Sequence, residues 1–398
     1  MLNYIKKRII FLKRKVYLYF YRIINPFILI LLFFFSVPFI FIIRILKPWI
    51  HIRFGTFNDR LGDFAYDAGK QWASLSEKPS KQIDWYWIQG EVSNTQLDKM
   101  VRRNFKIFWW VRYLDYWNNF IPGGSNHHRP RSFPPTRDIT GIIERAKVKM
   151  EFHAEEDQKA IEWLYQQGWT KGEPFVCLIV RDEAYNELDH QFALDNNNWQ
   201  YQSFRNTEIE TYIPAMEWLA DQRVWVFRMG KIMKKPMLSN HKKIIDYAFH
   251  PQKSDFLDIW ILANCNLCIS VGTGPDAISD IYRRPILFLN YIPLGEFRSW
   301  SNAMHVPKTL VWESSNVELT CQEYLNNIYF NTNAYKNAGI KIKDLTSKEI
   351  LLSTQECWQR IQDKWRDTEE DCNKQKKFWK ILEQWPDFSK WHGWKHSN

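Results

Sequence analysis

The stretch Leu267-Cys-Ile-Ser-Val-Gly-Thr-Gly-Pro-Asp276 decides how the rest of the sequence is interpreted. The apolar run Leu267–Val271 predicts a buried strand, and it ends in two glycines that flank one threonine. Pro275 follows, and proline is favoured as the first residue of a helix. A strand, a glycine turn and a helix in this order predict an α/β fold with a parallel sheet, whose ligands bind at the carboxyl ends of the strands.

This turn is a candidate anion site. Glycine lets the backbone approach a ligand closely, and the free N–H groups at the start of a helix attract anions. We therefore expect Gly272, Thr273 and Gly274 to bind a nucleotide diphosphate, with Ser270 and Asp276 beside them. The third glycine of a dinucleotide fingerprint is missing, so NAD binding is not supported. The alternative is a tight turn that binds nothing.

Strands and helices alternate along the chain in two series, which predicts two Rossmann-like lobes. The first series has predicted strands at Trp49–Phe54, Asp84–Gln89 and Lys106–Val111, predicted helices at Phe64–Leu75 and Asn94–Asn104, and a polar loop at Gly55–Asp63. The second has strands at Phe175–Val180, Val224–Arg228, Leu267–Val271 and Ile286–Asn290 and helices at Glu208–Asp221, Asp255–Ala263 and Pro275–Tyr282. With a linking helix at Ala154–Gln167, the predicted regions are an N-terminal segment (1–48), an N-terminal lobe (49–168), a C-terminal lobe (169–330) and a helical, Trp-rich tail (331–398).

Residues 1–60 carry the whole net charge of +10, because they hold 11 Lys and Arg and a single acid. The remaining chain is balanced, so the basic pI does not indicate nucleic-acid binding. Ile23–Ile43 holds no charged residue, and Tyr4–Tyr21 alternates basic and apolar clusters. These patterns predict a membrane anchor with an interfacial helix, in contact with anionic lipids. Basic residues on both flanks favour a monotopic or re-entrant anchor at the cytoplasmic face of the cell membrane, and a single span is the alternative.

Three arginines fall at predicted strand ends or in adjoining loops: Arg181, Arg205 and Arg228. Arginine can bind phosphate oxygens with two N–H groups at once, so the three could neutralise a diphosphate. Asp255 lies at the start of a predicted helix, and we include it with these arginines and the glycine turn among the candidate nucleotide-binding residues. The alternative for each arginine is an ordinary salt bridge.

Longer runs resemble a known family. Ser203-Phe-Arg-Asn-Thr-Glu-Ile-Glu-Thr-Tyr-Ile-Pro-Ala, Val226-Phe-Arg-Met-Gly230 and Gly272-Thr-Gly-Pro are similar to bacterial glycosyltransferases found with surface-polysaccharide genes. The resemblance covers roughly residues 40–310. It implies a GT-B-like fold, in which residues 169–330 form the nucleotide-sugar lobe and residues 49–168 form the acceptor lobe. The donor would be a nucleotide sugar, and the acceptor would be a glycan or a lipid-linked glycan. The resemblance does not identify a catalytic residue.

Arg60-Leu-Gly-Asp63 is the candidate catalytic loop, with Asp63 as the base that accepts the proton of the acceptor hydroxyl. The loop resembles the Gly-Asp loop of heptosyltransferases, and we expect Arg60 and Gly62 to contact ligands there. Histidine is often found at this position in the closer family, and it too can accept a proton. The alternative is that Asp63 caps the helix predicted from Phe64.

His127 and His128 are candidate acceptor contacts in the long predicted loop Pro122–Arg137. No acidic cluster accompanies them and no Asp-x-Asp occurs, so neither a metal nor another cofactor is expected. Hydrolase and ATPase motifs are also missing. Besides a metal-independent glycosyltransferase, two functions stay open: a nucleotide-sugar epimerase or hydrolase of the same fold, and a non-catalytic scaffold in polysaccharide assembly.

Overall fold

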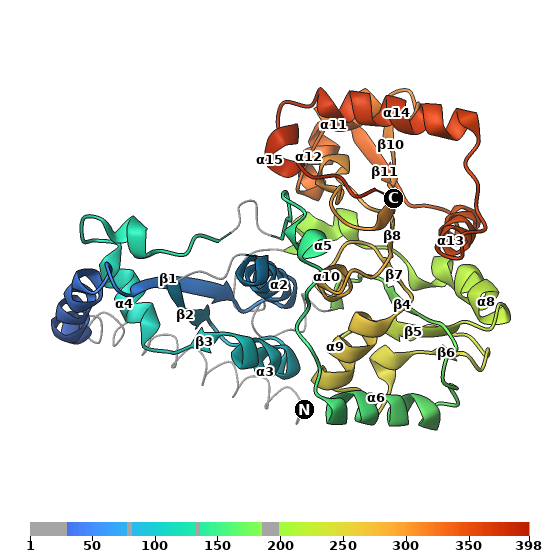
Figure 1. The fold of residues 1–398 in the computed structure, drawn as a ribbon. Coiled ribbons are helices and arrows are strands. Elements are labelled where there is room, and N and C mark those ends of the chain that lie inside the picture. Colours follow the sequence, from blue (N-terminus) through green and yellow to red (C-terminus); the bar gives the residue numbers. More distant parts are fainter. Residues whose placement is uncertain (1–29, 78–81, 132–135, 185–198, 398) are drawn as a thin grey trace, which may run out of the picture. The chain divides into compact units, whose positions relative to one another are not determined.

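The computed structural model describes residues 30–77, 82–131, 136–184 and 199–397, and it divides into two compact units (Figure 1). Unit 1 comprises residues 1–58, 79–91 and 102–131, and unit 2 comprises residues 59–78, 92–101 and 132–398. These units cut across the predicted lobes of residues 49–168 and 169–330, so those lobe boundaries stay a prediction.

Unit 2 is built on a six-stranded parallel sheet in the order β6-β5-β4-β7-β8-β9. Its strands are β4 (Phe175–Ile179), β5 (Trp225–Met229), β6 (Ile244–Ile245), β7 (Leu267–Ser270), β8 (Ile286–Leu289) and β9 (Ala303–Val306). Every residue of β4, β5, β7 and β8 is buried, as expected for parallel strands covered on both faces. Counted along the chain, the order is 3-2-1-4-5-6, which is that of a doubly wound nucleotide-binding sheet. The predicted α/β fold with a parallel sheet is therefore confirmed.

Helices cover both faces of this sheet (Figure 1). On one face, α8 (Ile213–Asp221) and α13 (Ser347–Ile361) share a hydrophobic core with alternate strand residues. On the other face, α6 (Ala154–Gln166) and α9 (Asp255–Asn264) pack their tryptophans against the aromatic residues of β4 and β5. The sheet is thus enclosed, and only its strand ends remain open to a ligand.

Several predicted bounds in unit 2 are wrong. α10 begins at Asp276, so Pro275 is its N-cap rather than its first residue. The predicted helix Glu208–Asp221 starts as a 3-10 turn, η3 (Ile209–Tyr212). The two-stranded antiparallel sheet of β10 (Thr309–Trp312) and β11 (Ile340–Lys343) was not predicted. The other elements of unit 2 are α5 (Ile142–Ala146), η2 (Trp199–Arg205), η4 (Tyr247–Phe249), α10 (Asp276–Ile281), η5 (Leu294–Glu296), α11 (Cys321–Asn326), α12 (Thr332–Asn337), α14 (Glu369–Glu383) and α15 (Phe388–Trp391).

Unit 1 holds a three-stranded parallel sheet in the order β1-β2-β3. The strands are β1 (His51–Asn58), β2 (Gln82–Gln89) and β3 (Lys106–Ile107), followed by α4 (Val111–Asn118) and η1 (Gly124–His127). The predicted loop Gly55–Asp63 is wrong, because β1 continues to Asn58. Gly55 marks a close approach in the strand instead of a loop: a Cβ there would lie 2.6 Å from the Tyr86 ring. The predicted strand Lys106–Val111 ends at Ile107, since α4 begins at Val111.

Residues 30–45 form a helix that belongs to unit 1. Its Ile40 and Ile43 are buried in one core with β1 and α4. Residues 23–29 of the predicted membrane segment, and the predicted interfacial helix Tyr4–Tyr21, lie outside the described residues. In the part of the chain that the structure describes, no helix combines the length and the apolar character needed to cross a bilayer.

Helices α2 (Leu61–Glu77) and α3 (Thr95–Asn104) begin in unit 2, where α2 packs against α10 through glycines. A Cβ on Gly69 would lie 2.9 Å from Cγ2 of Ile281. A Cβ on Gly62 would lie 2.8 Å from Cα of Gly274. These distances are shorter than ordinary contacts, so both glycines set the spacing of α2 and α10.

We predict that Gly69→Ala lowers the free energy of unfolding by roughly 1–2 kcal/mol, because the added methyl overlaps Ile281. Helix propensity alone would favour alanine by about 1 kcal/mol, so a loss of stability isolates the clash. Urea unfolding measures it. In a double-mutant cycle, Ile281→Ala removes the nearest methyl and should recover part of the loss, and strictly additive effects would contradict the contact.

Candidate functional site

A cavity of about 510 Å³ opens in unit 2 at the carboxyl ends of the parallel strands. Its walls come from the residues after β4 (Val180–Asp182), after β5 (Gly230–Met233) and after β7 (Gly272–Pro275). β4 and β7 are the two neighbouring strands at which the strand order reverses. Ligands of doubly wound sheets bind at this point, and the volume lies in the range of small-molecule sites.

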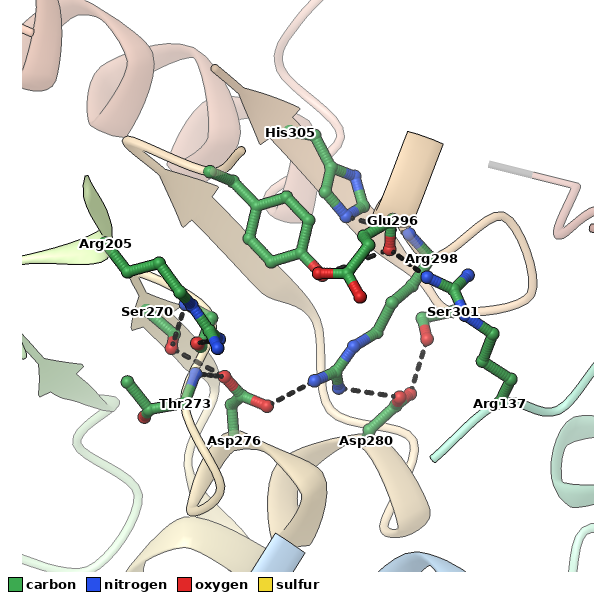
Figure 2. Close-up of polar contacts among 12 residues, drawn as sticks. Arg137, Arg205, Ser270, Thr273, Asp276, Asp280, Glu296, Arg298, Ser301 and His305 are labelled. Atoms are coloured by element: carbon green, nitrogen blue, oxygen red, sulfur yellow. Dashed lines mark hydrogen bonds and ion pairs between the residues drawn. The ribbon is translucent and has the colours of Figure 1, made fainter. Parts of the chain in front are cut away.

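The turn after β7 is held by side chains of the protein itself (Figure 2). The Gly272 N–H donates to Oγ of Ser270 (3.1 Å), and the Thr273 N–H donates to Oδ2 of Asp276 (2.6 Å). Ser270 also donates to Oδ2 of Asp276 (2.8 Å). The expectation that all N–H groups of this turn are free for a ligand is therefore wrong for these two residues.

The glycines of the turn are needed first for close packing. Gly272 has φ +80°, and a Cβ there would lie 2.3 Å from the ring of Tyr291. Gly274 faces the backbone of Gly62 across the α2–α10 contact. Both glycines and Thr273 nevertheless line the cavity. Among the described residues, the buried Oγ1 of Thr273 has no hydrogen-bond partner.

Arg298 holds the turn through the carboxylate of Asp276 (Figure 2). Its guanidinium donates to Oδ1 of Asp276 (2.5 Å) and to Oδ2 of Asp280 (3.0 Å), and both carboxylates are buried. Ser301 donates to the second oxygen of Asp280 (2.6 Å). Burial lowers the pKa of His305 well below its usual value, so its neutral Nε2 accepts the Arg298 backbone N–H (3.1 Å). Ser270 and Asp276 thus serve the turn, and neither lines the cavity.

Three cations of the cavity form no direct ion pair with a carboxylate among the described residues, although Glu296 attracts Arg137 and Asp258 attracts Lys231 at longer range. Arg205 donates to the carbonyl of Gly272, and Lys231 donates to the carbonyl of Ser93 (2.7 Å). Arg137 is 5% exposed and donates to backbone carbonyls that include Glu296 (2.9 Å). Carbonyls satisfy hydrogen bonds without neutralising charge, so the cavity is suited to an anion.

The C-terminal part of unit 2 closes the cavity beside Arg137. The Trp391 ring lies 4.2 Å from the Arg137 guanidinium, and both residues line the cavity. The Trp394 N–H donates to the carbonyl of Ile139 (2.7 Å), which fixes this segment against the residues that follow Arg137. Residues more than 250 positions apart in the sequence therefore build one wall.

Asp63 lines the cavity together with Arg60 and Gly62. The predicted alternative, that Asp63 caps a helix starting at Phe64, is wrong, because α2 starts at Leu61 and Asp63 lies in its first turn. Arg181 also lines the cavity and donates to Oε1 of Gln202 (2.9 Å).

Two further predicted contact residues of unit 2, Arg228 and Asp255, do not line the cavity. Arg228 is 1% exposed within β5 and pairs with Asp246 (3.0 Å). The Asp255 carboxylate accepts the backbone N–H of Thr95 (2.8 Å) at the start of α3. His127 and His128 belong to unit 1, where His127 is buried against the carbonyl of Ile52 (2.7 Å) and His128 contacts Asp115 (3.3 Å).

Part of the cavity lining is apolar, and a carboxyl group belongs to the same lining. Met229, Met233 and Leu262 line the cavity, together with Asp258 in the first turn of α9. Burial raises the pKa of Asp258 to about 7, although Lys253 acts in the opposite direction. Near neutral pH this side chain can donate or accept a hydrogen bond.

Sequence reasoning missed the cavity residues Arg137, Asp258, Glu296, Arg298, Trp300 and Trp391. Asp258 could have been found, since it lies one turn into a predicted helix that precedes the glycine turn. Arg137 and Arg298 stand in segments without any local pattern. Among the described residues, no group of three or more His, Cys, Asp and Glu side chains is arranged to hold a metal ion.

We predict that Arg298→Met destabilises the protein by about 3–5 kcal/mol, because two buried carboxylates lose their counterion. Urea unfolding measures the change. Arg366→Met is the matched control, since Arg366 pairs with Asp363 at the surface, where both side chains are exposed, and should cost less than about 0.5 kcal/mol. Equal effects of the two substitutions would show that Arg298 does not hold the turn.

We predict that Asp258→Asn stabilises the protein at pH 8 by about 4 kcal/mol and leaves it unchanged near pH 3. The pKa of Asp258 is about 7 in the folded protein, above the ordinary value of 3.8. The folded state therefore holds the proton more tightly, and the Asp258 contribution to stability falls as the pH rises from about 4 to 7 and is constant above. Unfolding of both proteins across this pH range measures it. Parallel pH profiles would contradict the raised pKa.

No protein-family model matches the sequence, and no curated protein matches it. Solved structures do match. A glycosyl transferase of family 9 from Veillonella parvula is 11% identical, with a TM-score of 0.46, over 78% of this chain and 98% of that chain. The ADP-heptose lps heptosyltransferase II of E. coli is 10% identical, with a TM-score of 0.43, over 78% and 99%. Each TM-score is below 0.5, so the function proposed next rests on the residues of the cavity, and the resemblance to surface-polysaccharide glycosyltransferases stays a prediction.

Proposed function

We propose that the protein is a glycosyltransferase that binds a nucleotide sugar in the unit 2 cavity and transfers the sugar to a glycan or lipid-linked acceptor of surface-polysaccharide synthesis. The observation that carries the proposal is the cluster of cations that form no direct ion pair with a carboxylate, Arg137, Arg205 and Lys231, in one cavity with the carboxylate of Asp63. A diphosphate would supply the missing negative charge.

The lining of the cavity suits both parts of such a donor. The diphosphate would lie at the glycine turn, where Arg205 and Thr273 line the cavity. The nucleoside would lie against Met229 and Met233, which offer contact area, and Asp258 offers one hydrogen-bonding group. Pockets of this kind combine an apolar lining with a few placed polar groups.

In the proposed reaction, the acceptor hydroxyl oxygen attacks the anomeric carbon while the bond from that carbon to the phosphate oxygen breaks. The nucleoside diphosphate leaves with the electron pair, and Asp63 takes the hydroxyl proton. Fixed positive charge of the arginines stabilises the leaving group as its charge grows. No metal ion enters this scheme, and metal independence is part of the proposal.

Membrane association at the cytoplasmic face, through residues 1–48, also belongs to the proposal. It is supported by the uncharged run Ile23–Ile43 and its basic flanks. Residues 30–45 place two isoleucines in the core of unit 1, so their removal would disturb the fold as well as the anchor.

We predict that UDP, GDP, ADP or CMP binds the full chain, and that Arg205→Met weakens this binding about 10- to 100-fold by removing one charged hydrogen-bond donor. Asp63→Asn should keep the binding and lose turnover of the sugar nucleotide by at least about 100-fold. Isothermal titration and release of nucleoside diphosphate in the presence of acceptor measure the two effects. Arg223→Met, at an exposed residue of unit 2, is the control and should change neither.

The alternatives give different outcomes in the same assays. Release of nucleoside diphosphate without any acceptor would favour a hydrolase or epimerase of this fold. Absence of binding by all four nucleotides would favour a scaffold. Normal turnover of Asp63→Asn would remove the proposed base while leaving the donor site in place.

A further inference from the structure

The helix of residues 30–45 has an apolar face on its outer side. Ser36, Ile40 and Ile43 form a buried stripe that faces the core of unit 1. On the exposed side, Phe34, Phe35 and Ile45 are 70%, 72% and 68% exposed. A helix on the surface of a soluble domain normally places polar residues outward. This outer face is therefore suited to an apolar environment.

The same apolar surface continues onto α4. Phe33 meets Trp117 of α4 edge to face at 4.9 Å, and Trp117 in turn contacts Tyr116 (5.1 Å) and Phe120 (5.9 Å). Tyr116 is 42% exposed and Phe120 is 67% exposed. We call the exposed surface formed by Phe33, Phe34, Phe35, Tyr116 and Phe120 the aromatic face.

Arg44 joins the helix firmly to the end of α4. Its guanidinium donates to the carbonyl of Pro122 (2.6 Å), to Oδ1 of Asn118 (2.7 Å) and to the carbonyl of Ile121 (3.2 Å). Burial lowers the pKa of Arg44, yet the guanidinium stays charged at any physiological pH. Helix and α4 thus present the aromatic face as one surface.

The charge of unit 1 fits an anionic partner. Its described residues hold nine Lys and Arg against three acids. Of these acids, Asp84 pairs with Arg53 (2.7 Å) and Asp115 is buried. Lys47 and Lys106 are exposed. Basic residues attract anionic lipid headgroups, and exposed aromatic rings are typical of surfaces at the headgroup level of a bilayer.

We propose that the aromatic face docks on an anionic lipid bilayer, with Tyr116 and Phe120 as a second membrane contact beside the N-terminal segment. The uncharged sequence that precedes residue 30 leads directly into this face. The inference rests on the membrane association within the proposed function and extends it to α4. Two attachment points fix the tilt of unit 1 on the membrane, which a single segment does not.

The test uses the full chain bound to vesicles of phosphatidylethanolamine with phosphatidylglycerol. A benzophenone amino acid replaces Phe120, Phe35 or, as the control, Phe249 of unit 2, which is 47% exposed. After illumination, lipid adducts are expected at Phe120 and Phe35, at least about tenfold above those at Phe249. Vesicles of phosphatidylcholine alone should lower the yield at Phe120 several-fold.

The other outcomes separate the proposals. Lipid adducts at Phe35 without adducts at Phe120 would overturn the second contact and leave the anchor. Absence of adducts at both would overturn membrane association itself. Adducts between two protein chains at Phe120 would identify the face as an interface between copies. An equal yield in uncharged vesicles would overturn the assignment to anionic headgroups.

Discussion

The buried pairing of Arg298 with Asp276 and Asp280 is the interaction on which the candidate site depends. Asp276 also accepts hydrogen bonds from Ser270 and from the Thr273 backbone, so one carboxylate holds both sides of the turn after β7. With the turn fixed from inside, its outer surface is free to form the cavity wall. The turn is thus held by a carboxylate of the protein itself, Asp276. The cations Arg205 and Lys231 line the cavity beside it.

The sequence predicts the fold of unit 2 well and the individual contacts less well. Apolar runs and glycine turns define the strands because parallel strands are buried on both faces, and this pattern is local. Whether a side chain reaches the cavity depends on whether its residue lies inside a strand or just after it. A shift of one or two residues in the strand end changes the answer. Arg228 was predicted at an edge, but it lies inside β5 and points to a face of the sheet, whereas Arg181 follows the end of β4 and reaches the cavity.

The role of a glycine is also ambiguous when only the sequence is known. Gly272 and Gly274 were predicted to admit a ligand, and the structure shows that they first admit Tyr291 and Gly62. Close approach of a neighbouring segment and close approach of a phosphate impose the same need on the sequence. Arg137 and Arg298 carry no local signal, since their partners lie far along the chain or in unpatterned loops. Such residues are found only when the packing is known.

The wall formed by Arg137 and Trp391 has a consequence for how the protein is made. Arg137 and Trp391 are in contact, although most of the sequence of unit 2 lies between them. The backbone N–H of Trp394 also donates to the carbonyl of Ile139. During synthesis the sheet of unit 2 can fold before Trp391 leaves the ribosome, whereas the cavity cannot close until then. A nascent chain that ends before Trp391 would therefore carry the folded sheet with an open pocket, and the wall of Arg137 and Trp391 would form only after Trp391 has been synthesised.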